Sequence, residues 1–300
     1  MNIIEIENLR KSYGKNEAVK GISFNVLDGE FFAFLGQNGA GKSTTINILT
    51  TALKLDSGRV SICGFDLVKE SDKIRKNIGV VFQNSVLDDA LSVRDNINVR
   101  GSFYKIKNYK QRFDFLAEEI GLTDFLSQKY GTLSGGQRRK ADIMRALINS
   151  PKVIFLDEPT TGLDPSTRVR VWQILKKLRR EENTTIFLTT HYMEEAEQAE
   201  RIGIIDNGKI LALDTPLSLK TKYSYDALKL IKKDNFSAVE KYLKAADIKY
   251  KIKADILTIK TLNSLESIKV INDLQQYISG FEMIRGKMES VFLNIISGDY

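Results

Sequence analysis

A nine-residue stretch, GQNGAGKST at 36–44, constrains the fold of this chain more than any other part of its sequence. Gly36, Gly41, Lys42 and Ser43 match the spacing G-x-x-x-x-G-K-[ST], in which a glycine-rich loop joins a strand to a helix. The apolar run FFAFLG precedes the loop, and STTINILTTAL, which has helical spacing, follows it. The glycines allow backbone N–H groups to face an anion, and the helix N-terminus adds a positive dipole. The stretch therefore predicts a site for the phosphates of a nucleotide.

Each polar residue of this loop has an expected role. Lys42 should reach the β- and γ-phosphates, the Ser43 hydroxyl should ligate Mg²⁺, and Thr44 should help to hold the α-phosphate. The alternative is a glycine-rich turn that matches by chance, which average residue usage allows in roughly one chain of this length in a hundred. The residues expected to bind the nucleotide are Gly36, Asn38, Gly39, Ala40, Gly41, Lys42, Ser43 and Thr44.

The hydrophobic pattern predicts an α/β fold. Short apolar runs at 31–36, 153–158 and 184–190 are typical of parallel strands that are covered on both faces. Each is followed by a turn and a helix-like segment, as in βαβ units. Alternating segments at 3–9 and 18–26 predict half-buried antiparallel strands, and RIGIIDNGKILAL predicts a hairpin that turns at 206–208. Together with the phosphate loop, this pattern predicts a P-loop NTPase core with an antiparallel β subdomain.

Two changes of pattern predict further parts of the chain. Strand signals are absent between about 84 and 140, where Phe113, Leu116, Ala117 and Ile120 have helical spacing, so a helical subdomain is expected. After about 220 the order strand, helix, two strands, helix, strand, helix predicts a small α+β domain. The expected domains are therefore 1–220, including the helical subdomain, and 221–300.

Composition excludes several classes of protein. One cysteine, Cys63, cannot form a disulfide framework, which fits a reducing compartment. No apolar run approaches the roughly 20 residues that span a bilayer, and the N-terminus has no basic-then-apolar leader. The net charge of +7 comes from scattered lysines, which favours a solvated surface over a nucleic-acid site. We expect a cytosolic chain, or one attached to a membrane through a partner, with no nucleic acid bound.

Polar residues follow two of the strand-like runs. VIFLDEPTTGLD places Asp157 and Glu158 at the end of a buried strand, where ligands gather in open α/β sheets. Asp157 is expected to hold Mg²⁺, and Glu158 to act as the general base that polarises or orients the attacking water. Gln83 follows VVF and could contact the Mg²⁺ or the water, so it is a third metal candidate beside Ser43 and Asp157. The alternative for the acid pair is a helix cap or a solvated turn.

The run LSGGQ at 133–137 predicts a second anion site. Ser134 is a plausible N-cap, and GQRRKADIMRALIN continues with helical character. This second helix N-terminus lies on the helical insertion, away from the phosphate loop of its own chain. We therefore expect a head-to-tail dimer in which each subunit completes the site of its partner.

His191 is the only histidine in the chain. Taken alone, a single histidine favours a structural or surface role. However, it follows the apolar run TTIFLTT, which we expect in the same parallel sheet as the phosphate loop. At that position its imidazole could contact the γ-phosphate and orient Glu158, so His191 joins Glu158 and Gln83 as a candidate catalytic residue.

Taken together, these motifs resemble those of an ATP-binding cassette, the nucleotide-binding subunit of an ABC transporter. The resemblance covers residues 1 to about 220 and rests on the ordered motifs KSYG, GQNGAGKST, FQ, LSGGQ, VIFLDE, TGLD and TTH. It implies a P-loop NTPase (RecA-like) core with a helical signature subdomain, and an ATPase that uses ATP and Mg²⁺ to power transport. It also implies a second cassette, in a homodimer or heterodimer, and integral membrane permease subunits that hold the pair at the cytoplasmic face of the cell membrane.

The resemblance implies roles for further residues. Tyr13 would stack on adenine, and Asp164 would line the dimer seam. The signature residues of one subunit would meet the γ-phosphate bound to the other; the nucleotide-binding candidates here are Ser134, Gly135, Gly136 and Gln137. The segment NSVLDDALSV at 84–93 suits docking of permease helices, and ordinary core packing is the alternative.

More narrowly, PTTGLDPSTR, THYMEEAEQAERI and MESVFLNIISG resemble segments of drug or antibiotic exporters of the daunorubicin-resistance type. Gln37 departs from the proline that is frequent at its position, and little effect is expected. Two other readings stay open: a soluble ABC ATPase that acts on the ribosome or DNA, and an importer cassette whose C-terminal domain is regulatory.

Overall fold

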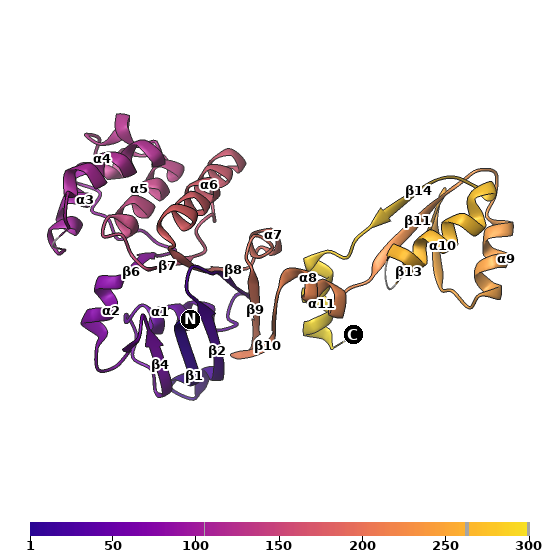
Figure 1. Cartoon of the computed structure of the whole chain (residues 1–300), viewed down its shortest axis with the longest axis horizontal. Coiled ribbons are helices and arrows are strands. Elements are labelled where there is room, and N and C mark those ends of the chain that lie inside the picture. Colours follow the sequence, from indigo (N-terminus) through magenta and orange to yellow (C-terminus); the bar gives the residue numbers. More distant parts are fainter. Residues whose placement is uncertain (105, 262–263, 299–300) are drawn as a thin grey trace. The chain divides into compact units, whose positions relative to one another are not determined.

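The computed structural model describes residues 1–104, 106–261 and 264–298 (Figure 1). The chain divides into two compact units, Met1–Leu213 and Asp214–Tyr300. The second unit thus includes α8 (Pro216–Tyr223), a helix that the sequence analysis did not predict. Its start follows local rules, because the Thr215 side chain accepts the N–H of Ser218 and Pro216 occupies the first turn.

The main sheet of the first unit has the strand order β10-β9-β3-β8-β7-β6. Its strands are β3 (Phe31–Leu35), β6 (Ile78–Val81), β7 (Val153–Asp157), β8 (Thr185–Thr190), β9 (Arg201–Asp206) and β10 (Lys209–Asp214). The strands from β9 through β6 pair in parallel, and every residue of β3, β7 and β8 is buried. The three predicted parallel strands are confirmed, and their carboxyl ends lie at one edge of the sheet.

A second sheet in this unit is antiparallel, with the order β2-β1-β4-β5. It consists of β1 (Asn2–Tyr13), β2 (Asn16–Leu27), β4 (Ser57–Ile62) and β5 (Phe65–Asp66). The core between the sheets contains stacked phenylalanines: the Phe24 ring lies 5.4 Å from those of Phe32 and Phe34. Helices α1 (Lys42–Leu49) and α2 (Ser71–Asn77) complete this part. Burial of these rings fixes the position of β3, which leads into the phosphate loop.

A group of helices lies on the other side of the main sheet (Figure 1). They are α3 (Val93–Ser102), α4 (Tyr109–Ile120), the short 3-10 turns η1 (Thr123–Phe125) and η2 (Tyr130–Thr132), α5 (Gly135–Leu147) and α6 (Pro165–Glu182). Helix α4 buries Phe113, Leu116, Ala117 and Ile120, the four residues that the helical spacing singles out. Helix α5 extends beyond the predicted limit near 140 and packs against β6. The short α7 (Met193–Ala196) follows β8.

The second unit contains one four-stranded antiparallel sheet with the order β12-β13-β11-β14. After α8 its elements are β11 (Asp226–Lys232), α9 (Ser237–Ala245), β12 (Tyr250–Lys253), β13 (Ile256–Thr261), α10 (Ser264–Leu274), η3 (Gln275–Tyr277), β14 (Ile278–Ile284) and α11 (Met288–Ser297). From β11 to β14 this is a βαββαβ arrangement of the ferredoxin-like kind. The order of strands and helices after residue 220 matches the sequence prediction. Among the described residues, no helix combines the length and the apolar character needed to cross a membrane.

Candidate functional site

The phosphate loop ends in a helix start that leaves backbone donors available. Gly41 is the N-cap of α1, and no side chain caps this helix end. The N–H of Thr45 makes a 3.0 Å bond to the carbonyl of Gly41, so the N–H groups of Lys42, Ser43 and Thr44 precede the intrahelical ladder. Three donors and the helix dipole therefore meet at one point, which is the arrangement that binds a phosphate.

Two loop glycines are required for different reasons. Gly41 has a φ of 106°, and a Cβ there would lie 2.6 Å from the carbonyl oxygen of Ala18. Gly36 has an ordinary backbone, but a Cβ there would lie 2.4 Å from the carbonyl oxygen of Ile205. Gly36, which the sequence analysis grouped with the nucleotide-binding residues, is thus required by its close packing against β9. Gly41 is required by the shape of the loop itself.

Lys42 is buried and surrounded by acceptors. Its Nζ donates to the carbonyl oxygens of Gly36 at 2.8 Å and Gln37 at 3.0 Å, and it lies 3.7 Å from Oε1 of Glu158. Burial lowers the pKa of the Lys42 ammonium, and the carboxylates of Glu158 and Asp157 oppose this shift. An additional anion near Nζ would favour the charged form of the lysine.

The two acids at the end of β7 have different surroundings. Asp157 accepts a hydrogen bond from the Thr189 hydroxyl on the neighbouring strand β8, and burial raises the pKa of its carboxyl. Glu158 has a φ of 45°, a left-handed conformation that costs a non-glycine residue roughly 1–2 kcal/mol. Its Oε1 lies 3.1 Å from Nδ1 of His191, and its Oε2 accepts the Thr161 hydroxyl at 3.3 Å. The strained residue is therefore the one that His191 contacts.

Most of the predicted loop residues, together with Gln83 and Glu158 from the strand ends, meet in one cavity of about 300 Å³. Its lining is Ala18, Asn38, Gly39, Gly41, Lys42, Ser43, Thr44, Gln83 and Glu158. The cavity thus brings together residues that are up to 140 positions apart, from Ala18 to Glu158. The predicted residues Gly36, Ala40, Asp157 and His191 are not part of its lining. Tyr13 does not line it either: this residue ends β1 and is 51% exposed, so its contact with adenine stays a prediction.

The signature residues form a second helix start, as predicted. Ser134 is the N-cap of α5 and accepts the N–H of Gln137, while the Gln137 side chain accepts the N–H of Ser134. Asp164 caps α6 in a similar way, through the N–H of Thr167 and the Ser166 hydroxyl. These hydrogen bonds hold the pKa of the Asp164 carboxyl well below its usual range. Gln137 and Asp164 thus stabilise helix starts within their own chain. The lining of the cavity contains none of the five predicted residues Ser134, Gly135, Gly136, Gln137 and Asp164.

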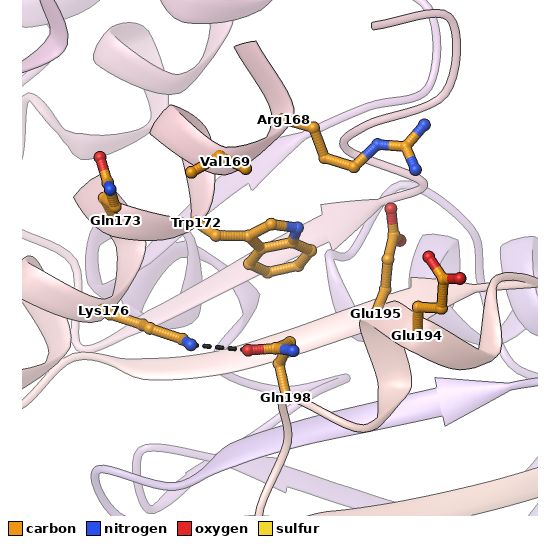
Figure 2. Close-up of a pocket in the computed structure, with 8 residues that line it drawn as sticks. All are labelled: Arg168, Val169, Trp172, Gln173, Lys176, Glu194, Glu195 and Gln198. Atoms are coloured by element: carbon orange, nitrogen blue, oxygen red, sulfur yellow. Dashed lines mark hydrogen bonds between the residues drawn. The ribbon is translucent and has the colours of Figure 1, made fainter. Parts of the chain in front are cut away.

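A buried glutamate that the sequence analysis missed supports His191. Glu195, on α7, accepts hydrogen bonds from the hydroxyls of Thr160 and Thr190, so it joins the segment after Glu158 to the residue before His191. Figure 2 shows Glu195 beside a separate pocket of about 290 Å³, which Trp172 and Arg168 of α6 also line. Burial raises the pKa of the Glu195 carboxyl. The only sequence signal was an acidic residue shortly after the histidine.

Comparisons with known proteins agree with this geometry. The family model for ABC transporters matches residues 19–161. The linearmycin resistance ATP-binding protein LnrL of Bacillus subtilis is 38% identical over 75% of this chain and 73% of its own length. The chain belongs to the ABC transporter ATP-binding proteins. It is therefore an ATPase of that family, and the resemblance found in its motifs is confirmed.

Other members of the family cover the cassette and the region beyond it. The daunorubicin resistance ATP-binding protein DrrA3 of Streptomyces coeruleorubidus is 33% identical over 99% of this chain and 96% of its own length. Among solved structures, the ATP-binding cassette MJ0796, a dimer in a post-hydrolysis state with ADP and Pi, gives a TM-score of 0.66 at 31% identity. The match covers 71% of this chain and 98% of that cassette. These likenesses confirm the predicted fold class of the cassette.

Proposed function

We propose that this ATP-binding cassette powers export as one half of a head-to-tail dimer, held at the cytoplasmic face of the membrane by separate permease subunits. The names of its relatives support an export role, since they refer to resistance to linearmycin and daunorubicin and to Nod factor export. The observation that carries the hydrolytic part is the position of Glu158, which lines the phosphate cavity and is held by His191 at 3.1 Å.

In this proposal Glu158 and His191 act on the water that attacks the γ-phosphorus of ATP. The Glu158 carboxylate orients the water and takes its proton, while the bond between the γ-phosphorus and the bridging oxygen breaks and ADP and phosphate are released. His191 fixes the carboxylate through Nδ1, which leaves its other ring nitrogen for the γ-phosphate. Lys42 and the N–H groups at the start of α1 neutralise the charge on the phosphates.

The residues that would hold Mg²⁺ supply suitable ligands. Asp157, Ser43 and Gln83 offer a carboxylate, a hydroxyl and an amide oxygen, all of the hard type that Mg²⁺ prefers. Among the described residues, no group of three or more His, Cys, Asp or Glu side chains is arranged to hold a metal by itself. The set therefore suits an ion that arrives with the nucleotide, with phosphate oxygens completing its shell. When bound, Mg²⁺ would add charge neutralisation at the phosphates.

The dimer part of the proposal rests on the start of α5. Ser134 offers a hydroxyl and a helix N-terminus, and neither it nor the next three residues line the cavity of the same chain. A second subunit, placed head to tail, would bring this start to the γ-phosphate and allow Gly135 and Gly136 to approach it closely.

The permease part of the proposal rests on the segment 84–93. Its residues Val86 and Leu91 are 59% and 36% exposed, which favours docking of permease helices over core packing at these two positions.

Two measurements test the proposal. The purified chain should release phosphate from ATP in the presence of Mg²⁺, and it should co-purify from membranes with a polytopic protein. Replacing Val86 and Leu91 by aspartate should abolish the co-purification and leave the basal ATPase rate unchanged. No phosphate release from a folded chain, alone or with membranes, would refute the ATPase mechanism; recovery without any membrane partner would refute the export role.

A further inference from the structure

Arg139, on α5, is a buried arginine whose donors all point to the edges of the catalytic strands. It is 7% exposed. Its Nε donates to the carbonyl oxygen of Pro159 at 2.6 Å, and one terminal nitrogen donates to those of Asp157 and Glu158, each at 3.1 Å. The other terminal nitrogen donates to the carbonyl oxygen of Phe82 at 2.5 Å. One side chain thus contacts the backbone of both acids and of the residue before Gln83.

Three successive carbonyl groups, those of Asp157, Glu158 and Pro159, face this one guanidinium. In an extended strand successive carbonyls point in alternate directions, so they cannot share a donor. The left-handed φ of Glu158, 45°, turns the chain and brings the three oxygens to one side. Buried carbonyl groups need hydrogen-bond donors, and Arg139 donates to all three; the Glu158 carbonyl also accepts the N–H of Thr161 at 3.3 Å. The conformation that directs the Glu158 carboxylate therefore depends on a residue of another helix.

Helix α5 also holds the segment on the far side of Gln83. Asp142, one turn after Arg139 and 5% exposed, accepts the hydroxyl of Ser85 at 2.6 Å. Arg139 contacts Phe82 and Asp142 contacts Ser85, so the two side chains bracket Gln83 in the sequence. The same helix starts at the signature residue Ser134. A displacement of its start would therefore reach the Glu158 backbone through a direct hydrogen bond, and Gln83 through its neighbours Phe82 and Ser85.

We propose that Arg139 is a positioning residue for ATP hydrolysis that couples the signature helix to Glu158 and Gln83. This inference rests on the proposed function and adds to it a route by which the docked partner affects the water-orienting acid. Arg139 does not line the phosphate cavity, so we expect its effect on the rate of hydrolysis and not on nucleotide binding by the single subunit.

Arg145 provides a matched control on the same helix. It is 8% exposed, and it donates to the carbonyl oxygen of Val80 on β6 rather than to the turn at Asp157–Pro159. If these arginines only fasten α5 to the sheet, their replacement should have similar consequences. If Arg139 positions the catalytic turn, its replacement alone should slow hydrolysis.

The experiment compares Arg139→Gln, Arg139→Lys and Arg145→Gln in the full chain by urea unfolding, ATP affinity and kcat per folded molecule. We expect both glutamine variants to lose stability and to keep an ATP Kd within about threefold of the parent chain. Of the two glutamine variants, only Arg139→Gln should lower kcat, by about tenfold to a hundredfold, as for a misplaced catalytic group. Arg139→Lys, which keeps a charge and three donors, should give an intermediate kcat.

Equal kcat values for Arg139→Gln and Arg145→Gln would overturn the inference. If Arg139→Gln does not fold, Arg139→Lys decides the matter, and a parental kcat in that variant is then the contrary result. A parent chain without ATPase activity would instead refute the proposed function. The two failures are therefore distinguishable.

Discussion

Glu158→Gln should stop hydrolysis and leave ATP bound, because this substitution removes a base and a charge but hardly changes the shape. The new amide keeps an oxygen that can accept the Thr161 hydroxyl and a group that can meet Nδ1 of His191. Glutamine has the same branching as glutamate, so the left-handed backbone at this position is no less favourable. We expect the free energy of unfolding to change by no more than about 1 kcal/mol.

The magnitudes follow from two contacts. A positioned general base contributes roughly 10²- to 10⁴-fold to a rate, and kcat should fall by about that factor. The Lys42 Nζ lies 3.7 Å from Glu158 Oε1, and both groups are buried. At an effective dielectric constant of about 20 their attraction is about 4 kcal/mol, and this attraction competes with the phosphates for the lysine. Asp157 and two carbonyls still engage Lys42, so most of that attraction is not released to the phosphates. A gain at the lower end of a charged hydrogen bond, about 1.5 kcal/mol, is what we expect. ATP should then bind about tenfold more tightly.

Three assays check this prediction with one protein preparation. Phosphate release gives kcat, calorimetric titration gives the ATP affinity, and sedimentation velocity with ATP and Mg²⁺ reports a stable dimer. Glu194→Gln, an exposed acid on α7 outside the phosphate cavity, is the control for a lost negative charge. Turnover within threefold of the parent chain would remove Glu158 from the role of general base. Weaker ATP binding would show that Glu158 does not compete with the phosphates for Lys42.

Three other substitutions separate the parts of the site. Lys42→Ala removes the buried ammonium and should weaken ATP binding by about 10- to 150-fold, the loss expected for a charged hydrogen bond of 1.5–3 kcal/mol, as measured by titration. His191→Ala should bind ATP normally but hydrolyse it roughly a hundredfold more slowly, since Glu158 loses its partner; a parental rate would return His191 to a structural role. Ser134→Arg should keep the ATP affinity of the single subunit and prevent ATP-dependent dimers, and intact dimers in sedimentation would contradict the head-to-tail arrangement.

The parts of the fold that the sequence predicted are those with strong local signals. Apolar runs identified β3, β7 and β8 because strands covered on both faces have no polar alternation. The helical spacing identified α4 equally directly, and so did the succession of strand-like and helix-like segments for the elements of the second unit. Helix α8 was missed, although Thr215 and Pro216 form a recognisable helix start, because its few buried residues give it almost no hydrophobic period.

Residues of the candidate site were predicted where a sequence motif specifies the residue type. A residue such as Arg139, whose hydrogen-bond partners are backbone groups, was missed. Lys42, Gln83 and Glu158 were found because their residue types and spacing carry the chemistry, and the structure brings them to one cavity. Arg139 bonds to four carbonyl oxygens, and every residue type has a carbonyl. The identity of its partners therefore leaves no trace in the sequence. Glu195 was missed for a different reason: its partners are the hydroxyls of two threonines, 35 and 5 positions away, and no motif marks that combination.

The adjacent acids Asp157 and Glu158 show how the structure changes an argument made from the sequence. Neighbouring residues on a strand point to opposite faces, so a strand that simply continued would direct only one of them to the nucleotide. Both carboxylates nevertheless act on Lys42, because the chain leaves β7 through a left-handed residue at Glu158. The conformation is costly, and the hydrogen bonds from Arg139 and the contact with His191 oppose its relaxation. The placement of the Glu158 carboxylate is thus a property of α5, β7 and β8 together, and a change in any one of them should move it.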